Sequence, residues 1–220
     1  MALSAVNEAG PPEPVHDCTL CPRLVGFRHD NEAAHPDWFN GAVPSFGPGT
    51  ARLLIVGLAP GLRGANRTGR PFLGDHAGEL LYLTLLKTGL ARGTHDVSAP
   101  EALELVDCMI TNAVRCVPPQ NKPKPDEIAR CRVFLIGRMA ALPNLRTLLA
   151  IGRIAHDSIL DTFGLRKRDL PFVHGARHDL PTGLKLIDSY HYSRQNTNTG
   201  RLTTPMFEEV VGAAAVSLTR

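Results

Sequence analysis

The sequence predicts an α/β fold, with a central parallel four-stranded sheet and helices on both faces. Four short apolar runs are expected to form the strands: 52–57, 107–114, 145–152 and 184–191. Their apolar character is continuous rather than alternating, which is typical of parallel strands buried on both faces. Segments with helical periodicity lie between these runs, so right-handed crossovers would join successive strands.

Four segments are predicted to be helices: 76–90, 126–142, 153–164 and 203–219. The first follows Asp75, a residue type favoured at N-caps, and the last carries Pro205, which fits best in a first helical turn. The second presents an apolar face with members at helical spacing: Ile128, Cys131, Leu135, Met139 and Leu142. Residues 165–183 are rich in turn formers, and we assign no element to them.

The composition is that of an ordinary soluble globular protein, and its 220 residues fit a single domain spanning 1–220. Residues 1–16 are rich in proline and small side chains and are expected to form a loose tail. No apolar run approaches the roughly 18 residues of a membrane span, so no membrane partner is expected. The first residues lack a secretory-signal pattern, which predicts a cytoplasmic protein with free or metal-bound thiols.

The net charge of +3 is too small to indicate nucleic-acid binding, but its distribution is uneven. Segments 58–75, 115–125 and 191–201 carry net charges of +2, +3 and +2, which leaves about −4 for the rest of the chain. Each segment follows a predicted strand, and ligands of open α/β sheets bind at the carboxyl ends of strands. We therefore expect the three segments to share one edge as a basic patch facing a polyanion.

The loop after the first strand is rich in glycine, which usually indicates close approach of backbone to a ligand. It reads LAPGLRGANRTGRPFLGD and ends at Asp75. No Gly-Lys-Ser/Thr closes it, and it lacks the Gly-x-Gly-x-x-Gly dinucleotide pattern. A nucleotide-phosphate loop of either common type is therefore not indicated.

Four cysteines have a spacing that suits one metal centre: Cys18 and Cys21 in a C-x-x-C, and Cys116 and Cys131 further along. Separate buried cysteines are an alternative. A redox C-x-x-C is disfavoured, because it lies outside any βαβ unit. The spacing leaves zinc and an iron–sulfur cluster both open. Cys108, inside the second strand, is expected to be an ordinary core cysteine.

Four motifs, in order along most of the chain, resemble family 5 (type b) uracil-DNA glycosylases. They are GLAPG…NRTGRPFLGD, TNAVRCVPPQNKP, the four-cysteine set and SYHYSRQNTNTGRLT. The resemblance implies a uracil-DNA glycosylase-like fold whose N-terminal segment is stapled by a structural 4Fe-4S cluster, with zinc the less expected metal. It implies a monofunctional enzyme that excises uracil, hypoxanthine and etheno-bases from double- or single-stranded DNA. We expect a monomer, associated with the nucleoid when bound to DNA.

The resemblance also suggests catalytic residues. Related family 4 enzymes carry an acid directly after the first motif glycine, where this chain has Leu58; the type b carboxylate maps onto Asp75. Asp75 would stabilise the sugar cation and orient water, although its alternative is the helix N-cap. Asn121 would help to hold that water, or is a simple turn residue. His191 would donate to a base carbonyl oxygen, or is structural; Tyr192 follows it where many relatives have proline, which questions the rigidity of that loop.

A base pocket is expected around the first strand end, since a glycosylase must enclose an extruded base. The backbone of Gly57, Leu58, Ala59 and Gly61 would approach the base and sugar. Phe72 would stack on the base, its alternative being a core aromatic residue. The Asn112 amide would read the base edge, its alternative being a buried, hydrogen-bonded asparagine.

Six residues are candidate DNA contacts, with ordinary solvated side chains as the alternative: Arg63, Arg67, Lys122, Arg194, Gln195 and Arg201. Arg194 or Gln195 would enter the duplex where the base has left. Two other functions compete with the glycosylase. One is a nucleotide- or phosphoester-processing enzyme, which is disfavoured because the sequence has neither a Walker lysine nor a clustered acidic metal site. The other is a metal-stapled binder of damaged DNA without catalysis.

Overall fold

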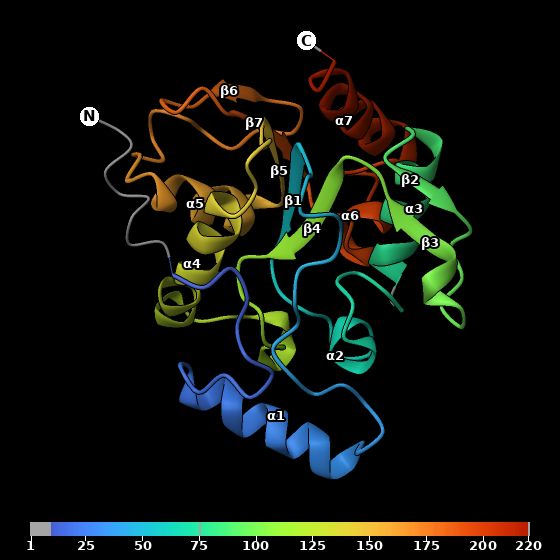
Figure 1. The fold of residues 1–220 in the computed structure, drawn as a ribbon, viewed down its shortest axis with the longest axis vertical. Coiled ribbons are helices and arrows are strands. Elements are labelled where there is room, and N and C mark those ends of the chain that lie inside the picture. Colours follow the sequence, from blue (N-terminus) through green and yellow to red (C-terminus); the bar gives the residue numbers. More distant parts are fainter. Residues whose placement is uncertain (1–9, 75, 220) are drawn as a thin grey trace.

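The computed structural model describes residues 10–74 and 76–219, and its centre is a five-stranded sheet with the order β4-β1-β5-β7-β6 (Figure 1). The four predicted strands are confirmed as a parallel set: β1 (Leu53–Gly57), β4 (Cys108–Asn112), β5 (Thr147–Ile151) and β7 (Lys185–Ser189). The predicted number of four is wrong, because β6 (Arg177–Asp179) pairs antiparallel with β7 at one edge. Its sequence, RHD, has no apolar run, so only the partner strand defines it.

The four predicted helices are also confirmed, with slightly earlier ends. They are α3 (His76–Lys87), α4 (Pro125–Ala140), α5 (Arg153–Thr162) and α7 (Thr204–Val216). Pro205 lies in the first turn of α7, where the Thr203 hydroxyl caps the helix by accepting from the Met206 amide at 3.4 Å. The predicted N-cap Asp75 lies outside the described residues.

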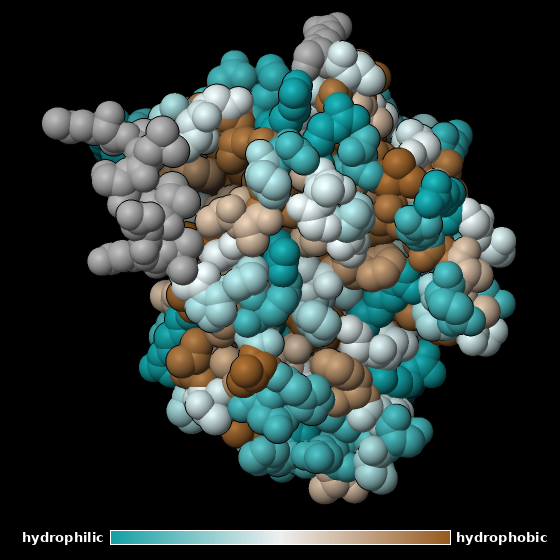
Figure 2. All heavy atoms as spheres, viewed as in Figure 1, coloured by the Kyte–Doolittle hydropathy of each residue, from teal (hydrophilic) through white to brown (hydrophobic). Residues whose placement is uncertain are grey.

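Several further elements were not predicted. They are α1 (Pro22–Ala34), α2 (Ala65–Thr68), α6 (Arg194–Asn198), the hairpin of β2 (Ala91–Gly93) and β3 (Leu103–Leu105), and the 3-10 turns Pro100–Ala102 and Pro119–Asn121. Helix α1 lies below the sheet layer, at the bottom of Figure 1, where hydrophilic residues predominate on the viewed surface (Figure 2). In the described part of the chain, no helix is both long and apolar enough to cross a bilayer.

The two faces of the sheet bury two separate cores, and the alternation of side chains along each strand divides them. Leu53 and Ile55 of β1 face the core that α3 and α7 complete. Leu54 and Val56 face the opposite core, which α4 and α5 complete. Strands β1, β4 and β5 are fully buried, and β7 is buried except for Lys185, which explains why the strand sequences read as continuous apolar runs.

The three expected ligand loops do leave from one edge of the sheet. Gly57 at the end of β1 pairs with Asn112 at the end of β4, and β7 ends at Ser189 in register with Ile151 of β5. Beyond the strands, the Val114 amide still donates to the Leu58 carbonyl at 3.0 Å. The parallel register therefore brings the loops after β1, β4 and β7 together, as the sequence predicted.

Residues 10–16 are not a loose tail, which corrects that part of the prediction; residues 1–9 lie outside the described chain. The Glu13 carboxylate accepts hydrogen bonds from the Ser45 amide at 2.9 Å and from Arg115 Nη1 at 2.8 Å. It also accepts from Arg138 Nε at 2.9 Å. The Arg115 side chain is only 1% exposed, so Glu13 supplies its compensating charge. This ion pair fixes the N-terminal segment to the loop after β4.

We expect Glu13→Ala to lower the free energy of unfolding by about 3–5 kcal/mol, because it leaves the buried Arg115 guanidinium without its carboxylate. Chemical denaturation measures the change. Glu104→Ala is the matched control: the Glu104–Arg92 pair is 65% and 70% exposed. Its loss should cost at most about 1 kcal/mol. Equal effects of the two substitutions would contradict the role of Glu13.

The same pair predicts a pH dependence. Burial raises the pKa of Glu13. The positive charges of Arg115 and Arg138 and the hydrogen bonds from Ser45 lower it by more, so the pKa lies below its usual value. A depressed carboxyl pKa stabilises the fold above the unfolded value of about 4.3, and this contribution is lost as the pH falls further. Acid destabilisation between neutral pH and the folded pKa should therefore be smaller in Glu13→Ala than in the wild type.

Candidate functional site

Gly57, at the carboxyl end of β1, is packed so closely that no side chain fits there. A Cβ at this position would lie 2.3 Å from Phe72 Cζ and 2.5 Å from Asn112 Oδ1. The Phe72 ring and the Asn112 amide therefore both lie against the Gly57 backbone. Three residues that the sequence assigned to one pocket, from two strand ends and the loop between β1 and α3, do meet.

The Asn112 side chain is buried, at 2% exposure, yet its Oδ1 atom has no hydrogen-bond partner among the described residues. A buried acceptor without a partner costs about 1–3 kcal/mol. Such an atom beside a glycine backbone is suited to accept a hydrogen bond from a ligand. The alternative was a buried asparagine whose polar atoms are hydrogen-bonded within the protein. The oxygen of Asn112 does not meet it among the described residues.

Phe72 has a left-handed backbone conformation, with φ of 59°, which is uncommon for an aromatic residue. The Phe72 carbonyl group lies against Gly78 in the first turn of α3, where no side chain fits, because a Cβ on Gly78 would lie 1.4 Å from the carbonyl oxygen. Phe72 is 6% exposed and belongs to the core that α3 and α7 complete. Its ring is thus part of the core and, through Gly57, part of the candidate pocket.

His191 lies on a cavity of about 220 Å³ at the end of β7, lined by Gly152, Arg153, Phe172, Tyr190, His191, Asn196 and Arg201. Gly152, with φ of 92°, directly follows β5 and lies against His191; a Cβ there would be 3.3 Å from the His191 Cβ. The side-chain amide of Asn196 donates to the His191 backbone carbonyl at 2.7 Å. The Arg153 and Arg201 guanidinium groups lie over the Phe172 and Tyr190 rings, at 5.3 and 4.8 Å. Two cationic side chains beside the cavity suit an anionic ligand such as a DNA phosphate.

Tyr192 anchors the His191 loop, which answers the question raised by the missing proline. Its side chain is 1% exposed. Its ring centroid lies 4.7 Å from Phe207 of α7, 5.9 Å from Phe72 and 5.3 Å from the His191 ring. A core aromatic residue therefore fixes this loop where many relatives have proline, and connects His191 to Phe72.

Phe72 does not line the cavity that contains His191. The two residues are connected through the Tyr192 ring rather than across one opening. Asp75, expected to complete the catalytic set, lies outside the described residues. Asn121 is exposed, with φ of 56°, and its backbone N–H donates to the Pro118 carbonyl at 3.1 Å. Asn121 thus has the geometry of a turn residue, with its side chain at the surface.

The remaining loop positions are held by backbone pairing. The Gly61 carbonyl accepts from the amides of Gly64 and Asn66, at 3.2 and 3.0 Å, and this starts α2. Asn66 is fully buried, and its side chain donates to Asn40 Oδ1 at 3.0 Å. Ala59, half-buried, packs against the cysteine cluster. The burial of Asn66 was not predicted from the sequence, because a buried asparagine in a loop has no periodic signal.

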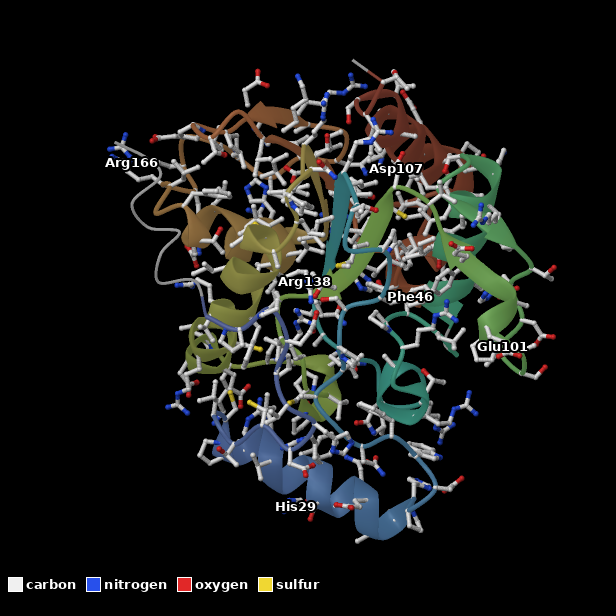
Figure 3. All side chains as sticks on the ribbon, viewed as in Figure 1. His29, Phe46, Glu101, Asp107, Arg138 and Arg166 are labelled. Carbon is white, nitrogen blue, oxygen red and sulfur yellow. The ribbon has the colours of Figure 1, made fainter. Side chains whose placement is uncertain are left out.

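The basic patch is smaller than the sequence count suggests. Arg63, Arg67, Lys122 and Arg201 are exposed, whereas Arg194 and Gln195 lie in α6 with side chains that are not described. Two arginines that were counted in the loops have structural roles, and Arg115 is one of them. Arg70 is the other: it lies 3.4 Å from the centre of the Phe46 ring and donates to the carbonyls of Pro100 and Leu103. Burial lowers the pKa of Arg70. Phe46 lies beside β4 (Figure 3), where its backbone pairs with Ile110.

Cys18, Cys21, Cys116 and Cys131 line one small cavity between α1, the loop after β4 and α4. Cys131 Sγ accepts a hydrogen bond from the Arg115 amide at 3.3 Å. Burial raises the pKa of Cys116 to about 12 and that of Cys131 to about 11, so without a metal these thiols stay protonated at neutral pH. Four convergent sulfurs with an amide donor fit a thiolate-bound metal group. Cys108 is confirmed as a core cysteine, fully buried, with its thiol donating to the Leu90 carbonyl at 3.1 Å.

Comparisons with known proteins match most of this chain. The family model described as the Uracil DNA glycosylase superfamily matches residues 44–215. A type-5 uracil-DNA glycosylase of Thermus thermophilus is 46% identical over 200 residues, covering 88% of this chain and 90% of its own. Type-5 enzymes of Mycobacterium bovis and Pyrobaculum aerophilum are 37% and 36% identical; the matches cover 88% and 90% of this chain, and 75% and 88% of those proteins.

Proposed function

Because this chain belongs to the uracil-DNA glycosylase superfamily, with type-5 relatives that match most of its length, we propose that it is a monofunctional type-5 uracil-DNA glycosylase. It extrudes a uracil nucleotide from DNA, hydrolyses the N-glycosidic bond and leaves an abasic site for base-excision repair. Its wider substrates are hypoxanthine and etheno-bases in double- or single-stranded DNA. It acts as a monomer in the cytoplasm, on the DNA of the nucleoid.

The observation that carries this proposal is the unpartnered Asn112 Oδ1 beside Gly57 and Phe72. Uracil has an N–H flanked by two carbonyl groups, so its edge offers the donor that this oxygen lacks. Phe72 provides the aromatic surface for stacking, an interaction of about 1–3 kcal/mol per base. The backbone of Leu58, Ala59 and Gly61 completes the pocket in this assignment.

Cleavage places positive charge on the sugar and negative charge on the departing base. We assign the Asp75 carboxylate to the sugar cation and to the attacking water, which Asn121 helps to hold. His191, as a neutral imidazole, donates to a carbonyl oxygen of the leaving base. The packing of Tyr192 against Phe207 supports this assignment, because it limits the movement of the His191 loop.

DNA binding is assigned to the exposed cations along the edge: Arg63, Arg67, Lys122 and Arg201. These side chains would contact phosphates, which carry affinity without sequence preference. Arg194 or Gln195 of α6 is assigned to the space that the extruded base leaves.

Cys18, Cys21, Cys116 and Cys131 would hold a 4Fe-4S cluster. The four thiols line one small cavity, and the Arg115 backbone amide donates to Cys131 Sγ at 3.3 Å, as amides do to the sulfurs of iron–sulfur clusters. When bound, the cluster would supply no acid or base, but would tie α1 to the loop after β4.

Asp75→Ala should lower uracil excision by roughly 10²–10⁴-fold, as expected for loss of a general base, while affinity for uracil-containing duplex stays within about 3-fold. Alkaline gel analysis of a labelled uracil duplex measures the abasic product. Asp37→Ala makes the same substitution at an exposed aspartate outside the proposed site; it is the control and should match the wild type. A wild-type protein that yields no abasic product from uracil or hypoxanthine DNA would reject the glycosylase. Damage-specific binding without product would identify the non-catalytic binder instead.

Gly57→Ala should lower excision by about 100-fold, because the new methyl group would displace Phe72 or Asn112 from the pocket. Gly49→Ala is the matched glycine control, since a Cβ there meets nothing within 4 Å. Excision rates and thermal unfolding are compared for both variants. A Gly57→Ala enzyme with wild-type excision would place the base elsewhere.

Cys131→Ser should lose iron and acid-labile sulfide together with the broad visible absorption of an iron–sulfur protein. Cys108→Ser is the control, because Cys108 is also buried but lies in another core. Elemental analysis of the purified variants tests the assignment. A colourless wild-type protein with stoichiometric zinc would reassign the metal, and retention of iron by Cys131→Ser would remove Cys131 from the ligand set.

A further inference from the structure

A second buried polar cluster lies behind the wall of the His191 cavity and has no part in the proposed chemistry. Its members are His156 of α5, His178 of β6 and Asp188 of β7. His156 Nδ1 lies 2.8 Å from Asp188 Oδ1, and His178 Nε2 lies 3.1 Å from Asp188 Oδ2. The side chains of His156, His178 and Asp188 are 1%, 10% and 0% exposed, so three polar groups are buried together.

The donor set suits a transition-metal ion. Two imidazole nitrogens and one carboxylate oxygen lie within 4.8 Å of one another. Ligands 2.0–2.1 Å from a single zinc ion lie roughly 3–3.5 Å apart, close to the 2.8 and 3.1 Å separations between each imidazole nitrogen and the carboxylate. Imidazole and carboxylate together are ligands that zinc and its neighbours accept.

The surroundings of His156 also match those of a metal-bound imidazole. His156 Nε2 lies 2.9 Å from the Leu170 carbonyl oxygen, so this nitrogen carries a proton. In the neutral ring, Nδ1 then carries the lone pair and points at the shared position. Metal-bound histidines almost always donate their second N–H to such an oxygen, which fixes the tautomer and the ring orientation.

Charge supports the same reading. The Asp188 carboxylate is completely buried, and the ion pairs found for it in the described chain involve only these two histidines. A buried carboxylate needs compensating positive charge. A divalent cation at the position that the three groups share would supply that charge.

We propose that His156 Nδ1, His178 Nε2 and the Asp188 carboxylate bind one divalent cation of the zinc class, in a structural site separate from the cysteine set. The ion ties α5 and the three-residue edge strand β6 to β7. It also stabilises the cavity wall, since the His156 ring lies 5.6 Å from Phe172, which lies 6.0 Å from Tyr190. Both aromatic residues line the cavity of His191.

The test compares zinc content in the intact protein with its cysteine-bound group in place. Wild type, His178→Ala and His178→Gln are treated with a chelator, incubated with excess Zn²⁺, gel-filtered into metal-free buffer and analysed for zinc and iron in the same sample. His29→Ala is the control, because His29 is an exposed histidine on α1. Wild type and His29→Ala should retain about one zinc per chain more than either His178 variant, with equal iron in all four.

Affinity and stability supply independent measurements. Competition with a chromophoric chelator should show zinc binding at least roughly 100-fold weaker in His178→Gln than in wild type, since losing a hydrogen-bond partner of a ligand already costs about 10–100-fold. Zn²⁺ should raise the Tm of wild type and His29→Ala, but not that of the His178 variants. Equal zinc in wild type and folded His178→Gln would overturn the proposal, as would no zinc beyond that held by the cysteines, which would identify a purely hydrogen-bonded cluster. Because the comparison is a difference, it holds whichever metal the cysteines bind.

Discussion

The close packing of Phe72 and Asn112 on the bare backbone of Gly57 is the constraint on which the candidate site depends. The parallel register places Gly57 beside Asn112, and the glycine leaves room for both side chains. Phe72 has a left-handed φ in this position, and its carbonyl group occupies the space beside Gly78 that a side chain would fill. Its ring then meets Tyr192, which fixes the His191 loop. Gly57 and Gly78 thus make room for Asn112 at the end of β4 and for Phe72 in the loop between β1 and α3.

The sequence was informative wherever one chemical property repeats along an element. Continuous apolar runs identified the parallel strands, and helical periodicity identified the large helices. Because parallel register alone brings strand ends together, the shared edge of Gly57, Asn112 and His191 followed from topology. The convergence of the four cysteines followed from their spacing and the family resemblance. These features need no knowledge of individual side-chain contacts.

Features that depend on one tertiary contact had no such signal. Strand β6 is polar and exists only through pairing with β7, and the orphaned oxygen of Asn112 depends on the exact position of a neighbouring backbone. Net charge was misleading for the same reason. Arg115 reads as a loop cation, but it is buried with Glu13, a residue of the supposed tail 102 positions earlier. A charge count gives the formal charge of a loop, but not which of its charges reach solvent.

Polar groups inside the protein support the active edge from two sides. On one side, the cysteine cluster and the Glu13–Arg115 pair hold the loop after β4, which carries Lys122. On the other, the His156–Asp188–His178 cluster lies behind the aromatic wall next to His191. Loops are the most mobile parts of most folds, whereas a glycosylase needs its loops fixed before the base arrives. The Glu13–Arg115 pair and the His156–Asp188–His178 cluster each tie segments distant in sequence through directional bonds, which apolar packing alone does not provide. Function on loops thus requires polar structure in the core behind them.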